Sequence, residues 1–141
     1  MKQNGKKDVT KKSKLRTYSK FKSNVKTEKY ITLNLTHNER SIIAQLRLGV
    51  LPLEIELGRF CNARSVEERI CKLCNEAVED EIHFTCECPF YTIERHNFYE
   101  NVNVDSSQDK VYILKYLFEE KSRQLAKYLL SIMHIRNGNR N

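Results

Sequence analysis

Residues 71–88 read Cys71-Lys-Leu-Cys74-Asn-Glu-Ala-Val-Glu-Asp-Glu-Ile-His83-Phe-Thr-Cys-Glu-Cys88, and we expect this stretch to decide the fold. Its spacing is C-x2-C-x8-H-x4-C, and a C-x2-C turn directs two thiolates toward one point. Zinc prefers four thiolate or imidazole ligands in a tetrahedral arrangement. The spacing therefore predicts one structural Zn²⁺ ion with these ligands: Cys71, Cys74, His83 and Cys88. Four protein ligands leave no open position for a catalytic water, so such a site folds a domain and does not catalyse.

The remaining cysteines leave one alternative open. Cys86 lies two residues before Cys88 and competes with it as the fourth ligand, although its shorter spacing from His83 makes it the second choice. Cys61 has no partner at a zinc spacing, so we interpret it as an ordinary buried or loop thiol. A plainer interpretation treats the cysteines as small hydrophobic residues, but the close, ordered spacing favours a metal site.

The N-terminus and the composition bear on where the protein works. The first lysines are not followed by an apolar stretch, so no signal peptide is expected. No run of about 18 apolar residues occurs, so no transmembrane helix is expected either. We therefore expect an intracellular protein, in the nucleus or the cytoplasm, where disulfides are rare and clustered thiols serve better as metal ligands.

Positive charge is concentrated at the N-terminus. Residues 1–30 hold 11 of the 25 Lys and Arg but only 2 of the 18 Asp and Glu, so the rest of the chain is slightly acidic. Residues 1–29 are therefore predicted to form a disordered basic tail, which either attracts RNA or DNA or serves only as a solubilising leader. The candidate nucleic-acid-binding residues are Lys11, Lys12, Lys14 and Arg16 in the tail, with Arg47 and Arg59 in the body.

The body is predicted to be a mainly helical domain over residues 30–136, because Leu, Ile, Lys and Glu are frequent and turn-forming residues are few. Within it we place a zinc module over 61–102 and C-terminal helices over 107–136. Residues 30–35 alternate apolar and polar side chains, which predicts a short extended segment before the first helix.

Two helices are predicted before the first ligand. Thr36 and Glu39 fit a capping box at the start of a helix, and Gly49 is placed to end it. Pro52 is placed to open a second, shorter helix that Gly58 would close.

Further helices are predicted around and after the ligands. A short one is expected to begin near Asp80 and to carry His83, and Pro89 is placed to open the next. A second capping box, from Ser106 to Asp109, precedes the C-terminal helices, and the residues after 136 are expected to fray. Helical spacing assigns three phenylalanines to the core: Phe84, Phe90 and Phe98.

Residues outside the ligand set carry a family resemblance. They are Ser41-Ile-Ile-Ala-Gln-Leu-Arg-Leu-Gly49, Leu51-Pro-Leu-Glu-Ile-Glu-Leu-Gly-Arg-Phe60, Glu79-Asp-Glu-Ile-His-Phe84 and Cys88-Pro-Phe-Tyr91 followed by Arg95. With the first cysteine pair, they resemble the zinc-binding region that lies C-terminal to the reverse transcriptase in retrotransposons lacking long terminal repeats. The resemblance covers residues 30–102 and, more weakly, the helices to 136.

The resemblance implies a zinc-binding module that assists the element's protein in gripping its RNA template or its target DNA. It also selects His83 and Cys88 as the last two ligands, because family members place them as His-x4-Cys-Pro. The chain departs from the family in having no polymerase, and it contains no pair of adjacent aspartates. It is therefore similar to a stand-alone C-terminal fragment, a remnant, or a gene built from one.

Two alternative functions stay open. The module packs against a protein partner or self-associates through a surface that once contacted a polymerase, or it is an expressed remnant without a cellular role. Enzymatic activity is not expected, because the other histidines have no evident nucleophile or carboxylate partner in sequence; these are His37, His96 and His134. Of these, His37 and His96 are expected at the surface.

Overall fold

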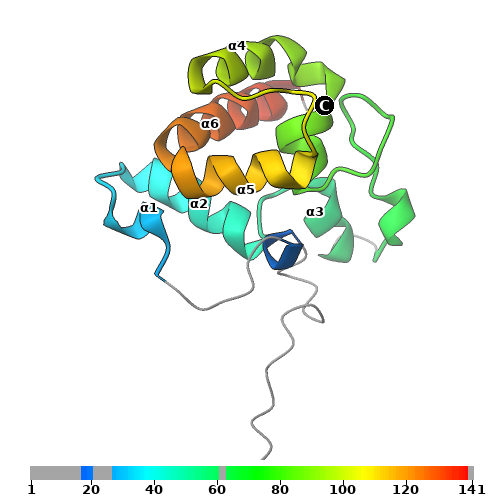
Figure 1. Ribbon diagram of the computed structural model, residues 1–141. Coiled ribbons are helices and arrows are strands. Elements are labelled where there is room, and N and C mark those ends of the chain that lie inside the picture. Colours follow the sequence, from blue (N-terminus) through cyan, green and yellow to red (C-terminus); the bar gives the residue numbers. More distant parts are fainter. Residues whose placement is uncertain (1–16, 21–26, 61–62, 140–141) are drawn as a thin grey trace, which may run out of the picture.

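The computed structural model describes residues 17–20, 27–60 and 63–139, and the predicted mainly helical fold is confirmed there (Figure 1). Within these ranges the sole extended pairing is an isolated antiparallel bridge between Ile70 and Val78. No helix in the same ranges is both long and apolar enough to cross a membrane. Packing between helices therefore determines the architecture of the described part of the chain.

The central helix is α6 (Ser122–Asn139), which packs against α2 (His37–Leu48), α4 (Thr92–Val102) and α5 (Lys110–Glu120). In Figure 1, α4 lies above α6, whereas α5 and α2 lie below it. Apolar side chains at helical spacing on α6 are fully buried; they include Leu125, Leu129 and Ile132. Because α6 contacts neighbours on several sides, it forms the centre of the core.

Helix α2 begins and ends where the sequence predicts. The Thr36 hydroxyl accepts a hydrogen bond of 3.2 Å from the backbone N–H of Glu39. The Glu39 carboxylate accepts one of 3.0 Å from the backbone N–H of Thr36, which completes the capping box. Gly49 ends the helix with φ of 67°, in the left-handed region where glycine avoids the clash of a Cβ.

The predicted extended segment at residues 30–35 is instead partly helical. Residues Lys29–Thr32 form one turn, α1, and its Tyr30 ring packs edge-on against Phe118 with ring centroids 5.7 Å apart. The prediction failed because Tyr30 is buried by contact with α5, a tertiary interaction that the local alternation of apolar residues does not reveal.

Helix α3 (Glu54–Phe60) differs from prediction at both ends. It begins after Pro52 and continues through Gly58 instead of closing there. A Cβ on residue 58 would lie 2.5 Å from Cγ of Arg69, so this glycine permits close approach of a side chain to the helix backbone. Arg69 is held in this position because its guanidinium donates hydrogen bonds to the backbone carbonyls of Ile55 and Arg64.

The C-terminal helices begin and end at other residues than predicted. Asp109 is the N-cap of α5, where its carboxylate accepts a hydrogen bond of 3.0 Å from the backbone N–H of Tyr112. The capping box that was predicted to begin at Ser106 is therefore wrong, because Asp109 is the first residue of the cap and not the last. Helix α6 continues to Asn139, so residues 137–139, which were expected to fray, are helical.

Residues 17–20, which were predicted to belong to a disordered tail, pack against the body. Thr17 donates a hydrogen bond of 2.8 Å to the buried carboxylate of Glu81. Tyr18 begins a short helix, η3 (Tyr18–Lys20), and its ring lies edge-on to Phe118 at 6.1 Å between centroids. Its hydroxyl donates a hydrogen bond to Glu28. The expectation for residues 1–16 and 21–26 lies outside the described part of the chain.

The assignment to the core is wrong for one of the three phenylalanines. Phe84 and Phe98 are buried, but 43% of Phe90 is exposed. The short helix η6 (Pro89–Tyr91) turns the next ring inward instead, and Tyr91 is fully buried against Phe84 with centroids 5.5 Å apart. The core position expected for Phe90 is therefore filled by Tyr91.

Candidate metal centre

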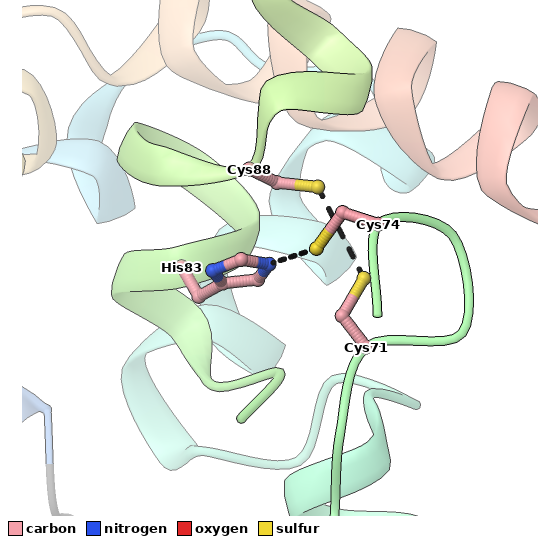
Figure 2. Close-up of side chains that lie close together, drawn as sticks. All are labelled: Cys71, Cys74, His83 and Cys88. Atoms are coloured by element: carbon pink, nitrogen blue, oxygen red, sulfur yellow. Dashed lines mark hydrogen bonds between the residues drawn. The ribbon is translucent and has the colours of Figure 1, made fainter. Parts of the chain in front are cut away.

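The first two candidate ligands lie on a tight hairpin. The Cys71 backbone N–H donates to the Ala77 carbonyl at 2.8 Å, and the adjoining bridge joins Ile70 and Val78. Asn75 occupies the left-handed region, with φ of 58°, and its N–H donates to the Cys71 carbonyl at 2.9 Å. This turn brings the Cys71 and Cys74 side chains to the same end of the hairpin (Figure 2).

Of the other two candidate ligands, His83 is the first residue of a π-helix, η5 (His83–Glu87), and Cys88 lies just past its last residue. The Asp80 carboxylate accepts a hydrogen bond of 2.8 Å from the backbone N–H of His83, so the acidic residue predicted at the helix start caps the helical residues 81–82 that lead into η5. The Cys88 N–H donates to the His83 carbonyl at 2.7 Å, which is the i to i+5 bond of a π-turn. The wide turn therefore places residues five apart on the same side of the helix.

The two halves converge on one point (Figure 2). One ligand atom from each residue lies within 4.8 Å of all the others; the four residues are Cys71, Cys74, His83 and Cys88. The sulfurs of Cys71 and Cys88 are 4.0 Å apart, and the Cys74 sulfur is 3.4 Å from Nε2 of His83. Cys74 is partly exposed, whereas the other three are buried. This donor set has the spacing that a four-coordinate metal ion needs, and it could hold one.

Hydrogen bonds concentrate negative charge on Cys71. A hydrogen bond from the Cys88 thiol, with smaller contributions from His83 and the backbone N–H groups of Cys74 and Leu73, lowers the pKa of Cys71 to about 3 despite the opposing effect of burial. The same bond, together with burial, raises the pKa of Cys88. Burial alone would lower the pKa of His83, but its hydrogen bond to Cys71 and the charge of that thiolate raise it. A bound cation would therefore displace protons from a site already prepared to hold positive charge.

Groups around the ligands fix the backbone near Cys88. Arg95, on α4, donates a hydrogen bond of 2.9 Å to the Cys88 carbonyl. Pro89, at the start of η6, has no N–H to continue the π-helix, so the chain turns directly after the ligand. The backbone N–H of Glu76 lies 3.5 Å from the Cys74 sulfur and supports the other half of the site.

The competing thiol of Cys86 is not part of this group. It is buried, and burial raises its pKa to about 11. It lines a groove with Arg95, Tyr99 and Lys110. The geometry therefore brings Cys88, and not Cys86, to the ligand cluster. Cys61 lies outside the described residues.

The two arginines outside the tail that were predicted to bind nucleic acid both contact other side chains of the protein. Arg47 lies over the Tyr18 ring, 5.1 Å from its centroid, and 3.9 Å from the Glu28 carboxylate. Arg59 lies 3.5 Å from the Glu56 carboxylate. The four tail candidates are outside the described residues; they are Lys11, Lys12, Lys14 and Arg16. All three remaining histidines are exposed; they are His37, His96 and His134.

The sequence reasoning missed the buried pair formed by Glu79 and Arg136, which lies beside the site. Glu79 was used only as part of the stretch that carries the family resemblance, and position 136 only as the last residue of the predicted helical domain. The two residues are 57 positions apart, and no local pattern of residues signals a pair at that separation.

Comparison with protein-family models, with curated proteins and with solved structures found no match to this chain.

Proposed function

We propose that this chain is a structural zinc-binding module, in which one Zn²⁺ ion joins the hairpin to η5. The convergence of four ligand atoms carries the proposal. Tetrahedral zinc, with bonds of about 2.3 Å to sulfur and about 2.0 Å to nitrogen, places two sulfurs about 3.8 Å apart and a sulfur and a nitrogen about 3.5 Å apart. The separations of 4.0 and 3.4 Å in the cluster are close to both values.

The chemistry of the donors favours zinc and a structural role. Three thiolates and one imidazole are soft or borderline ligands, which suit zinc better than magnesium or calcium. When bound, the ion would cross-link the hairpin of Cys71 and Cys74 to the segment that carries His83 and Cys88. Four protein ligands fill its coordination shell, so the proposal assigns no catalytic step to the site.

Metal analysis of two serine variants tests the proposal. Wild-type protein should contain one equivalent of zinc, and Cys88→Ser should lose most of it, because one corner of the tetrahedron is removed. Cys86→Ser is the matched control, since it changes a buried thiol in the same π-helix and should keep the full equivalent. Mass spectrometry of the native protein, with elemental analysis, measures the stoichiometry.

Two results would count against this assignment. Wild-type protein that is folded but free of metal, after purification with zinc present, would contradict the proposed zinc-binding function. Loss of zinc in Cys86→Ser with retention in Cys88→Ser would instead transfer the fourth position to Cys86.

For the wider role, we propose that the zinc module assists binding of RNA or DNA and derives from the C-terminal region of a retrotransposon reverse transcriptase. Two observations support this role: the family resemblance, and the excess of basic residues in 1–30, which hold 11 Lys and Arg against 2 Asp and Glu. Thr17 and Tyr18 are packed on the body, so the basic segment before them would be attached next to Glu81, two residues from His83. Nucleic acid held by that segment would lie close to the zinc module.

Salt dependence of RNA binding tests this wider role. We expect glutamine at Lys11, Lys12, Lys14 and Arg16 to weaken binding of single-stranded RNA and to reduce the slope of log affinity against log salt by about 3, if each residue neutralises one phosphate. Fluorescence anisotropy at several salt concentrations gives the slope. Glutamine at Lys115 and Lys127, on α5 and α6, is the control and should change the slope little. Equal slopes in wild type and the tail variant would exclude this segment as the contact.

A further inference from the structure

A buried ion pair links the end of α6 to the metal-site segment. Arg136 and Glu79 are each 1% exposed. The guanidinium donates two hydrogen bonds to the carboxylate, of 2.7 Å from Nε and 2.8 Å from Nη2. Such a two-point contact fixes both the distance and the orientation of the carboxylate. Removing Arg136 would leave the Glu79 carboxylate buried without its two-point partner, which is strongly unfavourable.

Glu79 lies at the junction between the two halves of the site, five residues after Cys74 and four before His83. Its backbone N–H donates to the Arg69 carbonyl at 3.0 Å, and its carbonyl accepts from the Ile55 N–H at 3.1 Å. Its carboxylate also accepts a hydrogen bond of 2.7 Å from the Glu54 N–H. Both the backbone and the side chain of Glu79 are therefore fixed, and the start of the helix that carries His83 is fixed with them.

The same network reaches the first pair of ligands. The Glu54 carboxylate is fully buried and lies 3.8 Å from both Arg136 Nη2 and Lys72 Nζ. Lys72 is inside the C-x2-C turn. The C-terminal end of α6 is thus connected to both halves of the ligand set. The Glu79 carboxylate connects it to the segment that carries His83, and the Glu54 carboxylate connects it to the turn that carries Cys71 and Cys74.

We infer that Arg136 is a positioning residue for the metal site, acting through Glu79; this inference rests on the proposed zinc-binding function. Metal ligands must meet within a few tenths of an ångström, and groups outside the ligand shell commonly hold them there. Arg136 holds Glu79 at the junction, so the ligands on both sides of that junction keep their relative positions. The metal site consequently needs the chain as far as Arg136, beyond the zinc module predicted over 61–102.

Cobalt substitution in the full chain tests the role of Arg136, because the visible spectrum of bound Co²⁺ reports coordination geometry. At saturating Co²⁺ we expect wild type to give the intense bands of a tetrahedral thiolate site and Arg136→Met to give weaker, shifted bands. Zinc affinity, measured by competition with a chromogenic chelator, should fall at least tenfold in that variant. Arg136→Lys keeps the charge without the two-point contact and should fall between them.

Two controls separate positioning from simple loss of stability. Leu125→Ala empties a buried position on the same helix, away from the ion pair; at saturating Co²⁺ it should keep the wild-type spectrum. The double variant Glu79→Gln with Arg136→Met removes both charges of the pair, so part of the stability should return, whereas the cobalt spectrum should stay altered because the two-point contact is still absent.

The outcomes distinguish this inference from the proposed function. Wild-type protein without a tetrahedral cobalt spectrum would contradict the zinc-binding proposal itself. A wild-type tetrahedral spectrum that is unchanged in both Arg136→Met and Arg136→Lys would overturn the positioning role alone. An altered spectrum that Leu125→Ala reproduces would also overturn it, because general destabilisation would then explain the change.

Discussion

The double variant Cys71→Ser with Cys74→Ser is expected to lose zinc and most of its stability, by about 5 kcal/mol or more. Structural zinc contributes about 10–16 kcal/mol of binding free energy in small zinc-finger peptides at neutral pH, which is comparable with the whole stability of a typical domain. The hairpin at Cys71 has a single β-bridge among the described residues, so the ion would be a main link between this hairpin and η5, beside the contacts that Glu54 and Glu79 make.

Circular dichroism and thermal unfolding measure this effect. We expect the variant, and wild type treated with a strong chelator, to lose helical signal and to melt at a much lower temperature. Cys86→Ser is again the control, because it removes a buried thiol outside the ligand cluster and should retain a zinc-dependent transition. A chelated wild-type protein that keeps its helices and its melting temperature would contradict the role of the metal in folding.

The second large effect is expected from Phe118→Ala, which should destabilise the protein by about 3–5 kcal/mol. The Phe118 ring is 2% exposed and packs edge-on against two other rings, those of Tyr18 and Tyr30. Its loss would leave a cavity at the place where residues 17–20 attach to the body. Trypsin should therefore cleave after Lys20 faster in the native variant than in wild type.

Urea unfolding and timed proteolysis with mass spectrometry measure the two consequences. Tyr112→Ala is a suitable control on the same helix, since 57% of its side chain is exposed and the change should stay within about 0.5 kcal/mol. If Phe118→Ala loses stability while cleavage after Lys20 keeps its wild-type rate, Phe118 does not hold residues 17–20 in place.

Sequence patterns predicted the features that depend on neighbouring residues. The capping box of Thr36 and Glu39 and the glycine at 49 need only a few positions, and both are found as expected. The ligand spacing likewise depends on one short hairpin and one short helix. The helix start at Asp80 could be anticipated from charge alone, because an acidic side chain accepts hydrogen bonds from exposed N–H groups there.

Features that depend on distant contacts were not predictable in the same way. Tyr18 is buried because α5 supplies Phe118, and nothing in the lysine-rich sequence around Tyr18 indicates that contact. Phe90 and Tyr91 are adjacent aromatic residues, and only the turn after Cys88 determines which of them faces the core. The pairing of Glu79 with Arg136 joins two polar residues that local patterns place at the surface.

The π-turn of η5 makes the site unequally tolerant of changes in length between His83 and Cys88. In an ordinary α-helix, residues five apart point about 140° away from each other, whereas residues three or four apart share a face. Deleting one residue from this segment would thus let it relax into a regular helix with both ligands still on one side. Adding one would require a still wider turn, so shortening is the cheaper route by which evolution or design can alter this loop.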